Sequence, residues 1–458
     1  MKSEADPTAE FPPHSQGPQP ASRREFLKIG SLGFGGLTLT QLLPLRAAAE
    51  SEVLAKPRSI VLLFLEGGPS QLETFDPKPD ASSEYRSPLG SIKTSLPGVE
   101  FGSLFPKMAG LANKMSVVRS FTHGDGDHGG AAHWVKTGHP WPPPFFGQAG
   151  LRVPQFAPSI GSVVSRARGT VHPQMGVPAY VCVRTVPGYE GDEAAWFGQA
   201  FAPFRLGTTN GTNTMLSNMT LKVSRERLND RLALLSSFDR MGHRLDTSGN
   251  LQALDDLRAQ ALRVVVGKAK HAFDLSLESD RLRDKFGPGL GQELLMARRL
   301  CEAGVSFVTI NNSYSGDIDG WDHHKKIVSS CQTMCPPVDH AVSVFIEDLY
   351  ARGLDKDVLL IIAGEFGRTP RLNKDAGRDH WAPLGFLVFV GGGLNMGRII
   401  GESDAKAAYP KSRPVSPQDL MATCFRVLGI DQELQFVGPG GRPAYMIYEG
   451  GKPIEELF

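Results

Sequence analysis

The chain has 458 residues, of which 41% are hydrophobic and 21% charged, and its formal net charge is +1. This composition is that of an ordinary globular protein and excludes a disordered chain or one embedded in a membrane. The balance of charge also excludes a broad basic surface for nucleic acid or anionic lipid, so an anionic substrate has to be attracted locally.

The first 49 residues have the features of an export signal. "SRREFLK", residues 22–28, contains the paired arginines of a twin-arginine signal, and a mildly hydrophobic run and three alanines at 47–49 follow it. We therefore predict a twin-arginine signal peptide at 1–49 and a mature protein, residues 50–458, that acts in the periplasm or outside the cell. Without the signal the net charge is zero, and no later stretch has the roughly 20 apolar residues of a membrane-spanning helix.

Short hydrophobic runs recur along the mature chain, with helix-like stretches between them. The runs cover residues 59–65, 115–120, 178–183, 305–311, 357–363 and 384–390, and their lack of alternation predicts strands covered on both faces. Helices are expected at about 251–276, 289–303, 337–352 and 416–428, the last with a capping-box pattern at Ser416 and Asp419. This order predicts one α/β domain with a mostly parallel sheet, helices on both faces, and a loop-rich and helical insertion at about 140–300.

The five cysteines indicate buried packing residues and no disulfide framework. Cys331 and Cys335 lie one helical turn apart, with His340 beyond them, which leaves a zinc site there as the alternative. A second cysteine pair is lacking, so the spacing favours packing.

Acids and histidines come directly after four of the predicted strands. Ligands of open α/β sheets bind outside the carboxyl ends of the strands, so side chains released there are candidates for one common site. The four segments are "EGGPSQLETFDPKP" from residue 66, "FTHGDGDHGGAAHWVKTGH" from 121, "NSYSGDIDGWDHH" from 312 and "GEFGRTPRLNKDAGRDHW" from 364. Their convergence predicts a metal or acid–base site at this edge of the sheet.

The candidate metal ligands combine carboxylates with imidazoles. This mixture suits zinc or another divalent transition metal, whereas oxygen ligands alone would suit calcium or magnesium. Asp322 and His324 share one side of an extended segment, while the rival pair of Asp319 and His323 would require a helical turn. The predicted ligands are Glu66, Asp322, His324, Glu365 and His380.

A second set of residues surrounds these ligands in the sequence. The segment from Asp127 reads as a helix N-terminus, which favours an anion, and it carries several histidines. Arg368 and Arg378 have the bidentate geometry that holds phosphate or sulfate, and their alternative role is pairing with nearby acids such as Asp375 or Asp379. Possible supporting residues are Glu73, His123, Asp127, His133 and Arg378.

Several ordered motifs resemble the exported family catalogued as domain of unknown function 1501, within the alkaline phosphatase-like superfamily that includes sulfatases. They are "GGPSQLETFDPKP", "RSFTHGDGDHGGAAHWVKTGH", "ARRLCEAGVSFVTI", "GWDHH", "GEFGRTP" and "GRDHW", and they extend over nearly the whole mature chain. The resemblance implies an alkaline phosphatase-like three-layer sandwich, with a mixed, largely parallel sheet between helix layers. It also implies a site that usually holds two metal ions.

The resemblance assigns places to the candidate ligands. Glu66 takes the place of the superfamily's first-strand acid, and Glu365 takes that of the acid in its Asp-His-Gly motif. Asp322 with His324, and then His380, resemble the ligands of the other metal ion.

Two positions depart from the superfamily pattern. Phe366 stands where a ligand histidine would follow the acid. Aligning Thr137 and Gly138 with the threonine-glycine of the sulfatase signature puts His128 at the nucleophile position, which is usually cysteine, serine or threonine. Thr122 and Ser70 are other nearby hydroxyls, and attack by a metal-activated hydroxide is the alternative to a covalent mechanism.

We therefore expect an exported hydrolase of a phosphate or sulfate ester, with His128 and Arg368 acting on a small-molecule or polysaccharide substrate. It would depend on divalent metal ions, zinc before calcium, magnesium or manganese, and would not bind nucleic acid. The competing hypothesis is a metal-bearing binding protein with the same fold and no turnover, because the usual nucleophile is missing at position 128.

Overall fold

The computed structural model describes residues 58–142, 156–184, 191–207, 268–313 and 320–458, together with residues 224, 226–227, 230–231 and 233–234. The predicted signal peptide at 1–49 and large parts of the predicted insertion at about 140–300 lie outside the described residues. Within the described ranges, no helix has both the length and the apolar character needed to cross a membrane.

A mixed sheet forms the centre of the described structure, with the strand order β12-β4-β11-β8-β1-β7-β5-β6. β1 pairs in parallel with β7 and β8, whereas β11 runs antiparallel to both of its neighbours, β8 and β4. The strands of this sheet are β1 (Ser59–Leu65), β4 (Ser116–Phe121), β5 (Tyr180–Arg184), β6 (Phe204–Arg205), β7 (Phe307–Asn312), β8 (Val358–Ala363), β11 (Gly385–Gly391) and β12 (Ile399–Ile400). The six predicted strands are therefore confirmed, as is a mostly parallel mixed sheet.

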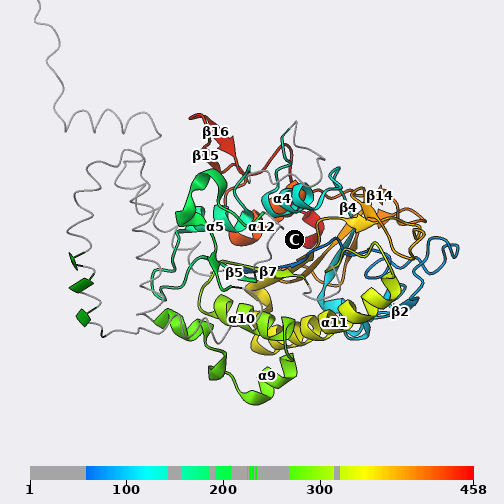
Figure 1. Ribbon diagram of the computed structural model, residues 1–458, viewed down its shortest axis with the longest axis horizontal. Helices are drawn as coiled ribbons and strands as arrows, with labels where there is room; N and C mark the ends of the chain where they lie inside the picture. Colours follow the sequence, from blue (N-terminus) through cyan, green and yellow to red (C-terminus); the bar gives the residue numbers. More distant parts are fainter. Residues whose placement is uncertain are drawn as a thin grey trace, which may run out of the picture. The chain divides into compact units, whose positions relative to one another are not determined.

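Helices cover both faces of this sheet (Figure 1). Alternate residues of β1 point to opposite faces, so Val61 and Leu63 join one hydrophobic core and Ile60 and Leu62 join the other. The first core contains α3 (Pro106–Gly110), α9 (Asp280–Phe286), α10 (Leu290–Glu302) and α11 (Ile327–Arg352), and the second contains α4 (His128–Thr137), α5 (Ile160–Arg168) and α12 (Pro417–Leu428). The predicted three-layer α/β sandwich is confirmed.

Shorter elements connect these layers. Four two-stranded ladders join β2 (Ser91–Lys93) with β3 (Glu100–Gly102), β9 (Gly367–Arg368) with β10 (His380–Trp381), β13 (Glu402–Ser403) with β14 (Pro410–Ser412), and β15 (Gln435–Val437) with β16 (Pro443–Tyr445). The 3-10 turns are η1 (Ala112–Lys114), η2 (Ala195–Phe197), η3 (Gln199–Phe201), η4 (Lys268–Phe273), η5 (Leu275–Leu277), η6 (Leu354–Lys356) and η7 (Glu455–Leu457).

Two helix boundaries differ from the prediction. The predicted helix at 337–352 begins earlier, at Ile327, and passes through Pro336 and Pro337. A proline removes one internal hydrogen bond, but here the apolar face before it, which includes Ile327 and Cys331, is buried and keeps the segment helical. The described end of the predicted helix at 251–276 consists of 3-10 turns, and residues 251–267 lie outside the described residues.

The predicted capping box of α12 is present, and its removal should destabilise the domain. The Ser416 hydroxyl accepts a hydrogen bond from the Asp419 amide at 3.3 Å, and the Asp419 carboxylate accepts one from the Ser416 amide at 2.8 Å. Ser416→Ala is expected to lower the free energy of unfolding by about 1 kcal/mol, measured by urea denaturation. Thr333→Ala, which removes an exposed hydroxyl inside α11, is the control and should change it far less.

Candidate functional site

The carboxyl ends of neighbouring strands bring the candidate residues together. Glu66 follows β1 and Glu365 follows β8, while α4 begins at His128 shortly after β4. The loop after β7 is tied to the end of β1 because the Trp321 amide donates to the Glu66 carbonyl at 2.9 Å. The antiparallel pair of Arg368 in β9 with His380 in β10 returns the last histidine to the same place.

Three imidazoles converge on the carboxylate of Asp322. The Nε2 atom of His128 lies 3.3 Å from Oδ2, and the Nε2 atoms of His324 and His380 lie 3.1 and 3.2 Å from Oδ1. The ligand atoms of His128, Asp322 and His380 all lie within 4.8 Å of one another. The Nε2 atoms of His324 and His380 are 3.0 Å apart, so His324 extends the cluster.

The other ring nitrogen of each imidazole has an acceptor of its own. Nδ1 of His128 donates to Glu365 at 2.7 Å, Nδ1 of His324 donates to Asp379 at 2.8 Å, and Nδ1 of His380 donates to the Gly126 carbonyl at 2.8 Å. These bonds set the tautomers and leave all three Nε2 atoms facing Asp322. Histidines that bind a metal ion commonly have this arrangement, in which an outer acceptor orients the ring.

The acids and imidazoles of the cluster shift one another's pKa values. Burial alone would raise the pKa of Asp322, but hydrogen bonds from His128 and His380, together with the charge of Arg368, hold it well below its usual range. Burial likewise opposes protonation of His128, and the carboxylates of Asp322 and Glu365 nevertheless raise its pKa to about 9. The position of His128 between these two acids therefore favours positive charge.

Arg368 is fully buried behind Asp322 and donates to protein groups. Its Nε donates to the Gly68 carbonyl at 2.8 Å, and its Nη1 donates to the Arg378 carbonyl at 3.0 Å. Its Nη2 donates to the Gly67 carbonyl and to Asp322. This geometry holds Asp322 in position and engages each nitrogen of the guanidinium with the protein itself.

Glu66 is fully buried and lies next to Lys136. Neither of its carboxylate oxygens accepts a hydrogen bond from the described residues, and Oε1 lies 3.9 Å from the Lys136 ammonium. Burial raises the pKa of Glu66 to about 8, and the charge of Lys136 opposes that rise. The buried Lys136 itself donates to Asp192 at 3.2 Å and to Asn311 at 3.0 Å.

Lys136 is not among the predicted site residues, because those are mainly acids and histidines that come after strands, whereas Lys136 lies near the end of α4. In the sequence, Lys136 follows the small or apolar residues Ala131, Ala132 and Val135. This apolar stretch was the signal that the lysine lies on the buried side of a helix.

Two of the predicted supporting residues form a buried ion pair. Arg378 and Glu73 are both fully buried and make two hydrogen bonds of 3.0 Å each. Arg378 also donates to the carbonyls of Thr369 and Pro370, at 2.9 and 2.6 Å. The partner of Arg378 is thus Glu73, and neither Asp375 nor Asp379 fills that place.

The remaining predicted residues make local contacts around α4. Asp127 is the N-cap of α4 and accepts from the amides of Gly129 and Gly130. His123 donates from Nε2 to the Glu365 carbonyl, and burial lowers its pKa to about 4. Both ring nitrogens of His133 are engaged, since Nδ1 bonds the His139 carbonyl at 3.0 Å and Nε2 accepts from the Ala157 amide at 3.2 Å.

The rival pair of Asp319 and His323 does not join the described cluster. Asp319 lies outside the described residues. His323 is buried, with Nε2 against the Gly320 carbonyl at 3.1 Å and Nδ1 3.7 Å from the Cys331 sulfur. All five cysteines are free and buried, which confirms that they form no disulfide framework.

The aromatic ring of Phe366 packs against two histidines of the cluster. Its ring is buried, 5.2 Å from the ring of His128 and 4.6 Å from that of His380, measured between centroids. Gly68 makes this packing possible, because a Cβ at that position would lie 2.5 Å from the Phe366 ring. The position where the superfamily pattern has a ligand histidine is thus filled by a packed aromatic ring.

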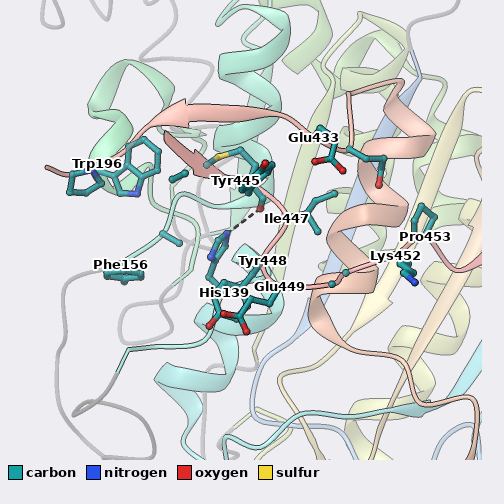
Figure 2. Close-up of a pocket in the computed structure, with 17 residues that line it drawn as sticks. His139, Phe156, Trp196, Glu433, Tyr445, Ile447, Tyr448, Glu449, Lys452 and Pro453 are labelled. Carbon is teal, nitrogen blue, oxygen red and sulfur yellow. Dashed lines mark hydrogen bonds between the residues drawn. The ribbon is translucent and has the colours of Figure 1, made fainter. Parts of the chain in front are cut away.

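A separate cavity of about 730 Å³ lies at the other end of α4 (Figure 2). His139, just beyond this helix, lines it and is bonded to the Met446 carbonyl at 3.1 Å, whereas His128 begins the helix. Aromatic side chains gather around it, namely Phe156, Trp196, Tyr445 and Tyr448. A ten-residue helix spans about 15 Å, so this cavity is distinct from the histidine cluster.

Several solved structures are similar to this chain at low sequence identity. A sulfatase, PsFucS1 from Pseudoalteromonas sp., is 13% identical with a TM-score of 0.37, and the match covers 91% of this chain and 73% of the sulfatase. A protein in the alkaline phosphatase superfamily from Vibrio parahaemolyticus is 13% identical, with a TM-score of 0.41 and coverages of 88% and 71%. The phosphonate monoester hydrolase SpPMH from Silicibacter pomeroyi is 11% identical, with a TM-score of 0.37 and coverages of 87% and 76%.

A comparison with curated proteins found no significant match. A family model does match, and it covers residues 57–458, the whole of the described structure. The chain therefore belongs to the family described as "Protein of unknown function (DUF1501)", as the ordered motifs predicted.

Proposed function

We propose that this chain is an exported, metal-dependent hydrolase of phosphate or sulfate esters. The observation that carries the proposal is the convergence of the Nε2 atoms of His128, His324 and His380 on the carboxylate of Asp322. Imidazoles whose Nδ1 atoms are each held by an acceptor have Nε2 oriented for a metal ion, which binds there as the Nε2 proton is released.

The donor set fits zinc. Two tetrahedral ligands of one Zn²⁺ are about 3.3 Å apart when each Zn–N distance is about 2.0–2.1 Å, and the Nε2 atoms of His324 and His380 are 3.0 Å apart. Calcium and magnesium prefer oxygen ligands, so they and manganese are the weaker alternatives here. A divalent ion at this place would supply Lewis acidity and lower the pKa of a bound water to roughly 7.

The protein's own residues would hold and orient this centre. Arg368 positions Asp322 through the bond from Nη2, and we assign it this role in place of the anion binding predicted from the sequence. Glu365 orients His128 through its Nδ1, and Phe366 closes the apolar side of the cluster. Because position 128 carries an imidazole, the proposed reaction is direct attack by water, with no covalent ester of the protein.

A binding protein without turnover is the second candidate, and one observation favours it. The start of α4 holds His128 between Asp322 and Glu365, where a covalent mechanism would need a hydroxyl or a thiol. The nearby Ser70 hydroxyl donates to the buried Glu73, so it is engaged in the structural ion pair.

The test uses purified mature protein, residues 50–458, saturated with Zn²⁺ and assayed with an aryl phosphate monoester, an aryl phosphodiester and an aryl sulfate. We expect turnover of one ester class, its loss in His380→Ala and its retention in His340→Ala, which changes a histidine outside the cluster. Bound zinc without turnover of any ester would favour the binding protein. Absence of bound metal would contradict both candidates.

A further inference from the structure

We infer that the site holds a single divalent ion, and that the ammonium of Lys136 neutralises Glu66 where a second ion would otherwise bind. The inference deepens the proposed function and rests on its claim that the histidine cluster binds metal. The residues near Glu365 form two sets. The first contains the imidazoles of His128, His324 and His380, and the second contains the acid Glu66 beside Lys136.

The first set has the ligands of one ion. His128, Asp322 and His380 form the group of potential metal ligands found among the described residues, and His324 contacts two of its members. Three imidazoles and one carboxylate complete a tetrahedral zinc site, or leave one position open if a ligand is replaced by water. Glu365 is then an outer residue, because its Oε1 accepts from Nδ1 of His128 and from the Gly67 amide at 2.8 Å.

Among the described residues, the second set does not form a group of ligands that could hold another ion. Its acids are Glu66 and Glu365, and neither the two oxygens of Glu66 nor Oε2 of Glu365 accepts a hydrogen bond from the described residues. Phe366 stands where the superfamily pattern has a ligand histidine, and its ring packs against His380. Glu66 instead faces Lys136, whose side chain is 1% exposed. A divalent ion placed on Glu66 would be repelled by this ammonium, and burial would leave little solvent to screen the repulsion.

Lys136 is held in place from several directions, so it cannot easily withdraw. Its Nζ donates to Asp192 and Asn311 and lies 4.4 Å from the centre of the Phe64 ring. Asp192 is in turn held by the Asn311 amide at 2.7 Å and the Tyr180 hydroxyl at 3.2 Å. The ammonium is therefore a built-in cation of the site.

The net charge of the buried groups is balanced by one divalent ion. The buried or half-buried acids in or next to the two sets are Glu66, Asp322, Glu365 and the Lys136 partner Asp192, and the fixed cations that contact them are Lys136 and Arg368. With all four acids ionised and the three imidazoles neutral, as metal ligation requires, two negative charges remain, and one divalent ion neutralises them. Buried charges are tolerated when they are compensated in this way.

The test is metal stoichiometry, measured by elemental analysis and by calorimetric titration of metal-free mature protein with Zn²⁺. We expect one equivalent in the unchanged chain and one in Glu66→Gln, with less than a threefold change in Kd, and none in His380→Ala. Two equivalents in the unchanged chain, or loss of an equivalent in Glu66→Gln, would overturn the single-ion inference and leave the proposed function standing. Absence of zinc from the unchanged chain would defeat the proposed function itself.

The role of Lys136 has its own readout. Lys136→Met should lower the Tm because Glu66 and Asp192 lose their counter-charge, and the double variant with Glu66→Gln should recover part of that loss. A double variant that melts at or below the Tm of Lys136→Met would show that the lysine does not neutralise Glu66.

Discussion

Asp322→Asn is expected to weaken Zn²⁺ binding by at least about 100-fold, because outer residues of metal sites alone account for 10–100-fold and Asp322 lies at the centre of this cluster. Its two oxygens face Nε2 of His128, His324 and His380, and asparagine would replace the negative charge with a neutral amide. Arg368 behind it would then repel the ion without an intervening carboxylate. Calorimetric titration with Zn²⁺, or competition with a chelator of known affinity, measures the change.

The matched control for this variant is Asp339→Asn. Asp339 is a buried acid outside the histidine cluster, and its carboxylate accepts from the amides of Lys107 and Met108. This control should lose some stability and keep its zinc affinity. Equal zinc affinity in Asp322→Asn and the unchanged chain would remove Asp322 from the metal centre and, with it, the main support for the proposed function.

Arg378→Met is expected to lower the free energy of unfolding by about 3–5 kcal/mol, because it leaves the fully buried Glu73 without its counter-charge. The same change removes the bonds to Thr369 and Pro370, which shape the loop between β9 and β10. Since His380 follows Arg378 by two residues, we also expect weaker zinc binding. Guanidinium chloride denaturation gives the first effect and calorimetry the second.

Two comparisons separate the buried charge from simple loss of contacts. The double variant Glu73→Leu with Arg378→Met should regain much of the lost stability, because two apolar side chains leave no charge without a partner. Lys411→Met, which breaks an exposed pair with Glu402, should leave the Tm almost unchanged. If Arg378→Met lowered the stability as little as the Lys411 variant does, the Glu73–Arg378 pair would not be important for the stability of the domain.

The sequence by itself determined the strands, the α12 cap and the edge at which the candidate residues gather. Runs such as 59–65 and 357–363 are apolar at nearly every position, so they identify strands buried on both faces wherever they stand in the sheet. The cap depends on Ser416 and Asp419 alone, which are three residues apart. The ordered motifs likewise identified the family, because they need only their order along the chain.

The direction of each polar side chain was decided by the tertiary structure. Arg368 satisfied the sequence pattern of an anion-binding arginine, yet the folded chain turns it towards the Gly67 and Gly68 carbonyls and Asp322. Glu365 had the sequence position of a metal ligand, and the structure sets one of its oxygens on His128.

Lys136 had no strand-end position and still lies beside Glu66. These contacts join residues that are far apart in sequence, so they depend on strand order and register, which local spacing does not contain.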